Sequence, residues 1–407
     1  MGLQSQQQLE RDSVMQTYGR KPVMFVRGEG MRLYDDEGRR YLDFLAGVGA
    51  VSVGHANTRV AQALSEQAAR LVHVGNYFYV EGRGELAGRL GQLLSGPAGM
   101  GPSWKLFFAN SGAEAVEGAI KIARKHGTQN LDGAFAVVSA RKSFHGRTLA
   151  ALAATGQAAK QDAFGPMPQG FVHVPLNDVE ALRAALDARG EGAPCAVLLE
   201  GIQGEGGVWP CEPEYLAAAR AMTAERGMLL MCDEVQTGFY RTGTHPFSYQ
   251  HHGVVPDVVT LAKGIANGMP MGAVAACGDA AELLCPGEHG STFGGSPLAV
   301  AAAHATLDEL EARDVASSVT RVGACLAEAL QQCALVTEVR GRGLMLAAQL
   351  AVPVAQEAAD AALAAGLVVN AIGDSILRLL PPLICTEADV DEALEILDGV
   401  LTRKAGE

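Results

Sequence analysis

The chain has 407 residues, of which 48% are hydrophobic and 19% charged, and its net charge is −13 at pH 7. This acidic balance argues against nucleic acid or an anionic membrane as a partner, because both require a basic surface. No apolar run is long enough to span a bilayer, and the polar N-terminus lacks the apolar core of a signal peptide. The eight cysteines form no C-x-x-C pair, so we expect free thiols in a reducing cytoplasm.

The N-terminal part predicts a hairpin followed by a helix. Residues 31–44 alternate around an Asp-Glu-Gly turn, which is typical of a β-hairpin. Residues 57–74 have the apolar spacing of a helix, with Asn57 as its N-cap.

Between about residues 104 and 278, short apolar runs alternate with helical patterns. Strands are expected at 104–108, 134–139, 196–199, 228–232, 258–261 and 272–277. Most of these runs are continuously apolar, as in parallel strands that are covered on both faces. A helix is expected at 214–225, with Gly227 as its C-terminal stop.

The C-terminal part predicts one long helix over about 297–334, and then strands at 344–350, 367–370 and 376–380. Thr386 opens a final helix, with Asp389 in capping-box spacing. We therefore expect an α/β protein with a large domain at 56–296 and a small α+β domain at 297–407. Residues 1–55 form an N-terminal segment that belongs to the small domain.

Two of the apolar runs end in a charged residue, Asp233 after the first and Lys263 after the second. A buried carboxylate or amine is costly unless something pairs with it. Pyridoxal phosphate would satisfy both, because its aldehyde forms a Schiff base with a lysine and its protonated ring nitrogen pairs with an aspartate. Taken singly, Asp233 also fits a helix cap or a buried ion pair, and Lys263 fits a solvated strand end.

A phosphate site is expected where the strand at 104–108 meets the following helix. Ser111 can cap that helix, with Glu114 in capping-box spacing. Gly112 and Ala113 then present free backbone N–H groups at the helix N-terminus, which is a site that suits a phosphate. The plainer alternative is a well-capped helix without a ligand.

Two loops after expected strands carry further candidates. Phe144 could stack on a cofactor ring, and Arg147 could hold a substrate carboxylate; the alternative is a surface loop with a packed phenylalanine. His145 fits a hydrogen-bonding residue better than a catalytic base. Glu200 and Glu205 follow a strand end, where open α/β sheets bind ligands, although each also fits a soluble turn.

The last candidates lie beyond residue 290. Ser291 and Thr292 offer hydroxyl groups to a phosphate, or simply form a glycine-rich turn. Arg378 alternates with apolar residues in a strand, so it points either to solvent or to an anion. Tyr77 and Tyr79 could line a substrate channel or pack at a dimer interface, and we favour packing.

The sequence resembles the class III, or ω-amino-acid, aminotransferases. The resemblance rests on Ser-Gly-Ala-Glu-Ala, Phe-His-Gly-Arg-Thr, Asp-Glu-Val-Gln-Thr-Gly, Leu-Ala-Lys-Gly and Ser-Thr-Phe-Gly-Gly, which occur in the family's order over nearly the whole chain. It implies the aspartate-aminotransferase-like fold, pyridoxal-phosphate fold type I, with a mixed, mostly parallel sheet in a large cofactor-binding domain. It also implies a homodimer whose subunits share the active site.

The resemblance assigns the cofactor site. Lys263 forms the internal aldimine and then shuttles the proton, while Asp233 keeps the ring nitrogen protonated. Gln236 touches the phenolic oxygen, and Thr292 reaches the phosphate of the neighbouring subunit. The full set of cofactor-binding residues implied in this way is Ser111, Gly112, Ala113, Phe144, Asp233, Glu234, Val235, Gln236, Lys263 and Thr292.

Within this family the sequence is most similar to the acetylornithine aminotransferases of arginine biosynthesis. That similarity implies that Arg147 binds the α-carboxylate of N2-acetylornithine and later the γ-carboxylate of 2-oxoglutarate. Arg378 takes the α-carboxylate of the second substrate and pairs with Glu205 in the amine half-reaction, and Ser291 also contacts substrate. Val48 stands where ornithine δ-aminotransferases have a tyrosine, which favours an acylated amine.

Other functions remain open at this level. Succinylornithine, ornithine, succinyldiaminopimelate and 4-aminobutyrate differ from acetylornithine by only a few pocket contacts. An aminomutase or a decarboxylase of the same fold would keep the cofactor and change the chemistry. A non-catalytic scaffold is disfavoured, because it has no use for both Asp233 and Lys263.

Overall fold

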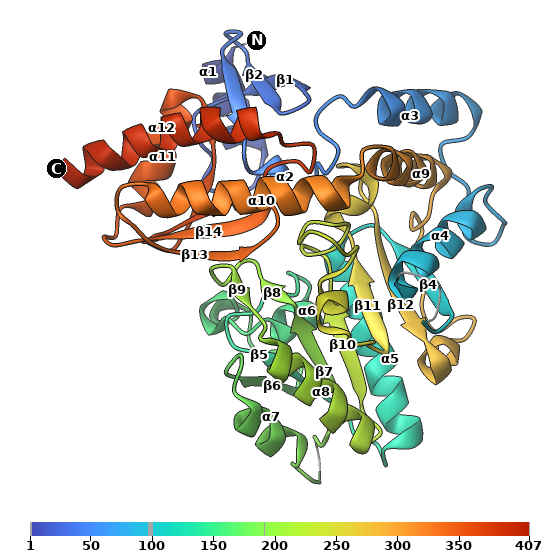
Figure 1. Ribbon diagram of the computed structural model, residues 1–407. Helices are drawn as coiled ribbons and strands as arrows, with labels where there is room; N and C mark the ends of the chain where they lie inside the picture. Colours follow the sequence, from blue (N-terminus) through green and yellow to red (C-terminus); the bar gives the residue numbers. More distant parts are fainter. Residues whose placement is uncertain (1, 97–100, 191, 407) are drawn as a thin grey trace.

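The computed structural model describes residues 2–96, 101–190 and 192–406. The lower lobe in Figure 1 is built on a seven-stranded sheet in the order β4-β12-β11-β10-β7-β5-β6. These strands are β4 (Trp104–Ala109), β5 (Ala136–Ala140), β6 (Phe171–Val174), β7 (Pro194–Glu200), β10 (Leu229–Asp233), β11 (Val258–Leu261) and β12 (Gly272–Cys277).

Five neighbouring strands of this sheet, from β6 to β11, run parallel, and β12 is antiparallel to both β11 and β4. The prediction of a mixed, mostly parallel sheet is therefore confirmed. All six expected strands are present, and all but the edge strand β4 are buried along their whole length because helices cover both faces. The edge strand β6 was not expected, since its partly exposed Phe-Val-His-Val sequence is not a continuous apolar run.

The helices of the lower lobe pack on this sheet. They are α4 (Arg83–Ser95), α5 (Gly112–Asn130), α6 (Leu149–Ala154), α7 (Val179–Leu186) and α8 (Pro213–Glu225). The helix expected at 214–225 is confirmed, and it stops before Gly227, whose φ of 63° suits glycine. In α5, one face packs against β12, β11 and β7, so the helix spans the middle of the sheet.

The single long helix expected over 297–334 is wrong. The structure has α9 (Pro297–Ala312) and α10 (Val315–Gln332), which are separated at Asp314. The φ of Asp314 is 44°, a left-handed conformation that ends one helix and re-aims the chain into the next. Both helices carry apolar faces, so the hydrophobic periodicity gave no sign of the break.

The upper lobe in Figure 1 contains elements from both ends of the chain. Its first sheet has the order β1 (Phe25–Glu29), β2 (Arg32–Asp35), β3 (Arg40–Asp43) and β15 (Leu367–Val368). The hairpin expected at 31–44 is confirmed as the antiparallel pair β2–β3. Because β15 pairs with β3, the N-terminal segment and the C-terminal part share one sheet. The division into 1–55, 56–296 and 297–407 stays a prediction.

The second sheet of the upper lobe has the order β13 (Val336–Arg342), β14 (Met345–Leu350), β17 (Ile376–Leu379) and β16 (Asn370–Ile372). The strand expected at 367–370 is wrong as one element, because β15 and β16 belong to different sheets. The remaining C-terminal helices are α11 (Ala355–Ala365) and α12 (Glu387–Gly406). The capping box is confirmed, since Thr386 N donates to Asp389 Oδ2 at 2.9 Å and Asp389 N donates to Thr386 Oγ1 at 3.3 Å.

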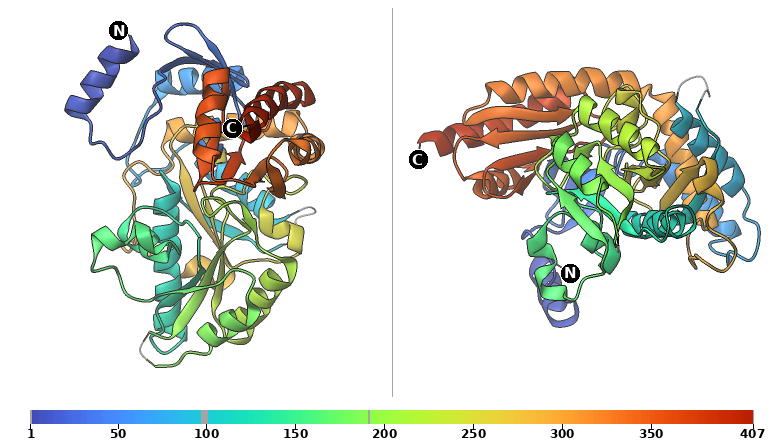
Figure 2. Two further views of the ribbon diagram at one scale, coloured as in Figure 1. Left: turned by 90° about the vertical axis from the view of Figure 1, so that its left-hand side faces the viewer. Right: turned by 90° about the horizontal axis from the view of Figure 1, so that it is seen from below.

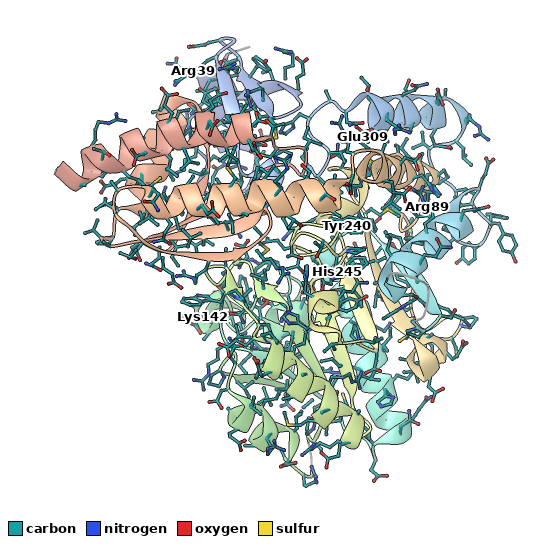
Figure 3. All side chains as sticks on the ribbon, in the orientation of Figure 1. Arg39, Arg89, Lys142, Tyr240, His245 and Glu309 are labelled. Carbon is teal, nitrogen blue, oxygen red and sulfur yellow. The ribbon has the colours of Figure 1, made fainter. Side chains whose placement is uncertain are left out.

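Helix α9 packs against α4 and against one further helix. α3 (Thr58–Arg70) begins as predicted at Asn57, whose side chain accepts from Val60 N at 3.2 Å. Figure 3 labels Arg89 and Glu309, which mark where α4 and α3 meet α9. Arg89 pairs with Asp308 at 2.8 Å, and Glu309 accepts from Arg59 at 3.2 Å.

The remaining named elements are α1 (Leu3–Ser13), α2 (Ala46–Gly49), β8 (Ile202–Gln203) and β9 (Trp209–Pro210). In Figure 2, α1 projects away from the rest of the chain, and none of its residues is buried. No helix in the described part of the chain is long and apolar enough to cross a membrane.

Candidate active site

A cavity of about 380 Å³ opens at the carboxyl ends of the parallel strands. Its wall comes from the segments that follow β5, β7, β10 and β11, together with the N-terminus of α5. Open α/β sheets bind ligands at this edge, because several loops converge there. The wall includes Ser111, Gly112, Ala113, Phe144, Arg147, Glu205, Asp233, Val235, Gln236 and Lys263. Ten of the candidate residues are therefore brought together.

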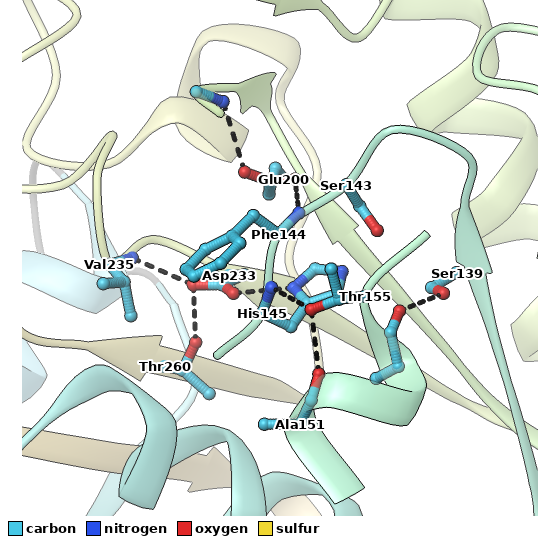
Figure 4. A network of polar contacts seen from close by, with 12 residues as sticks. Ser139, Ser143, Phe144, His145, Ala151, Thr155, Glu200, Asp233, Val235 and Thr260 are labelled. Atoms are coloured by element: carbon cyan, nitrogen blue, oxygen red, sulfur yellow. Dashed lines mark hydrogen bonds and ion pairs between the residues drawn. The ribbon is translucent and has the colours of Figure 1, made fainter. Parts of the chain in front are cut away.

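Asp233, the last residue of β10, is fixed by hydrogen bonds on both carboxylate oxygens (Figure 4). Oδ1 accepts from Thr260 Oγ1 at 3.0 Å and from Val235 N at 3.1 Å. Oδ2 contacts His145 Nδ1 at 2.8 Å. With an exposed fraction of only 4%, the carboxylate is held in one orientation facing the cavity.

His145 acts as a partner of Asp233. Burial lowers the pKa of His145, but the hydrogen bond and charge of Asp233 outweigh it, so the pKa lies above its usual value. Its backbone N donates to Thr155 Oγ1 at 2.9 Å, which fixes the loop. The sequence-based prediction of a hydrogen-bonding histidine agrees with this geometry.

Glu200, at the end of β7, lies fully inside the wall. Its Oε2 accepts from Phe144 N at 3.0 Å, and its Oε1 accepts from Gly204 N at 3.3 Å. Burial raises the pKa of Glu200 to about 7, despite the opposing charge of His145. Glu200 therefore links the Phe144 loop to the turn that carries Glu205.

Lys263 follows β11 and opens a short 3-10 helix, Lys263–Ala266, with a φ of 46°. Burial lowers the pKa of its amine to about 8, although the charge of Glu205 opposes the shift. Among the described residues, no group forms a hydrogen bond or ion pair with this amine. An unpaired amine that faces a cavity and whose pKa is lowered has a larger neutral fraction near pH 7 than an ordinary lysine, and the neutral form is a nucleophile.

The N-terminus of α5 forms the opposite wall. Ser111 caps the helix, since its side chain accepts from Glu114 N at 3.2 Å. A Cβ on Gly112 would lie 2.8 Å from Val235 Cγ1, so only glycine allows this close approach of the two segments. Free N–H groups at this helix end suit a phosphate.

Arg378, in the second sheet of the upper lobe, forms an ion pair with Glu205. Arg378 on β17 has an exposed fraction of 2%; its Nη1 donates to Glu205 Oε1, and its Nε donates to Asn370 Oδ1 at 3.1 Å. Burial raises the pKa of Glu205, but the charge and hydrogen bond of Arg378 outweigh it and lower that pKa. The pair predicted from resemblance is thus present, with Gln236 Nε2 at 3.5 Å from the same Glu205 oxygen.

Four candidate residues do not line this cavity, and one of them is Arg378, which reaches it only through Glu205. Glu234 points away from it and accepts from Ser248, Thr237 and Tyr249, because successive side chains after a strand alternate in direction. Ser291 and Thr292 line a separate surface depression together with Asn76 and Arg83. Ser291 still touches the cavity wall indirectly, since Asn110 Nδ2 donates to its Oγ at 3.1 Å.

Lys160, which ends the 3-10 helix Ala158–Lys160, lies beside the cavity and was not predicted from the sequence. Its Nζ lies 4.9 Å from the centroid of the Phe144 ring, and Arg147 Cζ lies 5.6 Å from the same centroid. No motif among those recognised contains Lys160, and its loop has no periodic pattern that could have singled it out.

The residues present fit pyridoxal phosphate. The set offers a buried carboxylate for a ring nitrogen, an unpaired amine for an aldehyde and a capped helix N-terminus for a phosphate. The wall also holds two orphaned polar atoms, Gln236 Oε1 and His145 Nε2, which have no hydrogen-bond partner in the described part of the chain. No group of at least three metal-ligating side chains occurs among the described residues.

Comparison with known proteins agrees with the site. The family model Aminotransferase class-III matches residues 14–401. An acetylornithine aminotransferase of Caldanaerobacter subterraneus subsp. tengcongensis is 45% identical over 398 residues, covering 97% of this chain and 98% of the relative.

Two solved structures extend the comparison to the fold. The ornithine aminotransferase of Toxoplasma gondii ME49 has a TM-score of 0.91 and 31% identity, covering 100% of this chain and 96% of that one. The acetylornithine aminotransferase of Elizabethkingia anophelis has a TM-score of 0.85 and 30% identity, covering 99% of this chain and 100% of that one. A family match over almost the entire length, together with these likenesses, shows that the chain belongs to the class-III aminotransferase family.

Proposed function

We propose that the protein is a pyridoxal-phosphate-dependent aminotransferase that moves the δ-amino group of N2-acetylornithine to 2-oxoglutarate. The observation that carries this proposal is one cavity lined by the unpaired Lys263 amine, the fixed Asp233 carboxylate and Arg147, with Arg378 paired to Glu205 in its wall. Relatives with the name acetylornithine aminotransferase at about 45% identity support the choice of substrate.

The chain's own residues have distinct roles in this reaction. When bound, the cofactor supplies an electron sink for the carbon that carries the amine. Asp233 stabilises a proton on the ring nitrogen, and His145 keeps Asp233 in place. Lys263 Nζ accepts and returns the substrate proton, for which a pKa of about 8 is well suited.

The substrate carboxylates need two arginines in different states. Arg147 is exposed and has no hydrogen bond or ion pair among the described residues, so it is free to bind the carboxylate of acetylornithine. Arg378 is paired with Glu205, so it can bind a substrate carboxylate only when Glu205 moves away. This arrangement supports a monocarboxylate as amino donor and a dicarboxylate in the second half-reaction.

A homodimer with a shared active site is part of the proposal. Tyr77, Phe78, Tyr79 and Phe293 are exposed apolar side chains, and such patches mark interaction surfaces. Asn76 Nδ2 donates to Ser291 O at 2.7 Å, so the two segments form one surface. Thr292 lies on that surface and outside its own cavity, which supports a contact with the partner's phosphate.

Sedimentation of a Tyr77→Ser, Tyr79→Ser double variant tests the dimer, and we expect weaker association than in the wild type. An unchanged dimer would contradict this surface.

The proposal also includes a place in arginine biosynthesis, which follows from the proposed substrate. It includes a cytoplasmic location as well, and the eight free cysteines support that location.

The absorbance spectrum of the purified holoprotein tests the reaction and the donor together. We expect N2-acetylornithine, added without a keto acid, to bleach the yellow band of the cofactor. A persistent band would reject this amine, and ornithine, succinylornithine, succinyldiaminopimelate and 4-aminobutyrate would be tested next. Turnover without any keto acid would favour an aminomutase. A protein that stays colourless with added pyridoxal phosphate would overturn the proposal.

A further inference from the structure

Two cations share one aromatic ring at the mouth of the cavity. Lys160 Nζ and Arg147 Cζ lie 4.9 and 5.6 Å from the centroid of the Phe144 ring. Phe144 and Arg147 line the cavity, and Lys160 lies beside them on the 3-10 helix Ala158–Lys160. The lysine is partly buried, whereas an ordinary surface lysine extends into solvent.

Neither of these cations has a counter-ion among the residues that the structure describes. Within the described residues, no carboxylate, carbonyl or hydroxyl oxygen accepts a hydrogen bond from the side chain of Lys160 or Arg147. The other arginine of the site differs, because Arg378 is paired with Glu205. Burial lowers the pKa of Lys160, and the nearby charge of Arg147 lowers it further, whereas the charge of Glu205 opposes the shift. Two neighbouring like charges favour the binding of an anion between them.

We propose that Lys160 and Arg147 together bind the substrate carboxylate that lies farthest from the reacting amine. This inference rests on the proposed function and adds one residue to its substrate site. The ligand class is a carboxylate on a short chain, either the α-carboxylate of an acylated diamino acid or the far carboxylate of a dicarboxylic keto acid. Both cations lie over the ring of Phe144, and this weak attraction keeps them beside the cavity while leaving each of them without a counter-ion.

A pair of amines that differ only in this carboxylate isolates the contribution of Lys160. N2-acetylornithine and N-acetylputrescine carry the same acyl group and the same reacting amine, but only the first has the carboxylate. In Lys160→Met holoenzyme we expect kcat/KM for N2-acetylornithine to fall about tenfold, mainly through KM, as for a lost charge-assisted contact. The value for N-acetylputrescine should not change, and Lys160→Arg should restore most of the loss.

Lys142 offers a matched control. Lys142 lies just before Phe144 in the same loop (Figure 3 labels it). Its Nζ is 5.4 Å from the ring centroid of Trp209, and it does not line the cavity. Lys142→Met should therefore leave both amines unchanged. An equal loss for both amines in Lys160→Met would show a structural role and overturn the proposal.

Binding of glutarate, an unreactive dicarboxylate, gives a readout that does not depend on turnover. Calorimetric titration of the holoenzyme should show about tenfold weaker binding in Lys160→Met than in Lys142→Met. Circular dichroism confirms that each variant is folded. If the wild type fails to react with either amine, the proposed function fails, whereas glutarate still tests Lys160. Unchanged glutarate affinity in a folded Lys160→Met protein would overturn the inference.

Discussion

Asp233, at the inner end of the cavity, has hydrogen bonds to Thr260, Val235 and His145, whereas Arg147 and Lys160, at the outer end, have none among the described residues. The inner group is almost fully buried, and the outer arginine is exposed. Between them lies the Glu205–Arg378 pair, which is formed but touches the cavity on one side only.

The difference in hydrogen bonding between the two ends of the cavity matches how long each ligand stays bound there. A resident cofactor is best held by groups whose orientation is fixed in advance, because nothing must be reorganised when it reacts. A substrate carboxylate must bind and leave in each half-reaction, and cations without an internal partner allow this. The Glu205–Arg378 ion pair in the middle can accommodate two substrates of different charge. When the pair is formed its net charge is zero, and when Glu205 moves away Arg378 is a free cation.

The largest effect is expected at the inner end, from Lys263→Ala. Turnover should fall by at least about a thousandfold, because no other amine among the described residues lines the cavity and could take its role as nucleophile. Steady-state kinetics with N2-acetylornithine measure this loss.

The fold should survive the same substitution. Alanine removes a half-buried amine that makes no hydrogen bond among the described residues, so the elution volume and circular dichroism should match the wild type. Near-wild-type turnover in Lys263→Ala would remove the central residue of the proposed function.

The next largest effect is expected from Asp233→Asn. The carboxamide cannot balance a positive ring nitrogen, so kcat should fall about a hundredfold. Asp257→Asn is the matched control, because Asp257 accepts from Leu230 N at 2.7 Å and pairs with Arg220 at 2.8 Å away from the cavity. Equal losses in the two variants would show that the effect is structural.

The pH dependence of this pair has a definite sign. Because the pKa of His145 is raised in the folded protein, its contact with Asp233 stabilises the fold fully below the unfolded histidine pKa. This stabilisation disappears as pH rises through the higher folded pKa. Imidazole NMR of Asp233→Asn should show a lower His145 pKa than in the wild type, because burial then acts without the opposing charge.

Much of this inner end could be predicted from sequence. The runs that became β10 and β11 are short, apolar and buried, and each places its terminal charged residue at one sheet edge. The direction of β12 could not be predicted, since Gly272–Cys277 is as apolar and as buried as its parallel neighbours. Its pairing depends on where the preceding chain returns to the sheet.

The outer end was less accessible to prediction. Lys160 is thirteen positions after Arg147 in an irregular loop, so only the folded chain brings both to the Phe144 ring. Glu234 shows the opposite error, because it is adjacent to Asp233 in sequence and yet faces Ser248 and Thr237. Sequence proximity predicted residues near the cofactor, but not the direction in which each side chain points.

A smaller effect is expected in the middle of the cavity, from Glu205→Gln. Arg378 then keeps Asn370 Oδ1 and Gly204 O as partners but loses its counter-ion, so it should bind an α-carboxylate more readily. The ratio of kcat/KM for glutamate to that for N2-acetylornithine should rise about tenfold.

Glu338→Gln is the matched control for Glu205→Gln. Glu338 also pairs with a buried arginine, Arg340, at 2.7 Å, but neither residue lines the cavity. The pKa of Glu205 is lowered by Arg378, so the wild-type pair persists at neutral pH and is lost only as pH falls through the lowered value. If both glutamine variants shift the ratio equally, the Glu205–Arg378 pair does not control substrate choice.

The smallest effect is expected from pH alone, and it separates the two lysines of the site. Only the neutral amine of Lys263 reacts with an aldehyde, and burial sets its pKa at about 8. Uptake of pyridoxal phosphate by the apoprotein, followed by absorbance, should therefore accelerate about fivefold from pH 7 to pH 8 and then level off. Lys160→Met should leave this profile unchanged, because Lys160 belongs to the outer end. A profile that is flat over this range would mean that the amine of Lys263 does not titrate near pH 8. The contrast between the inner and outer ends of the cavity would then fail at its most important residue.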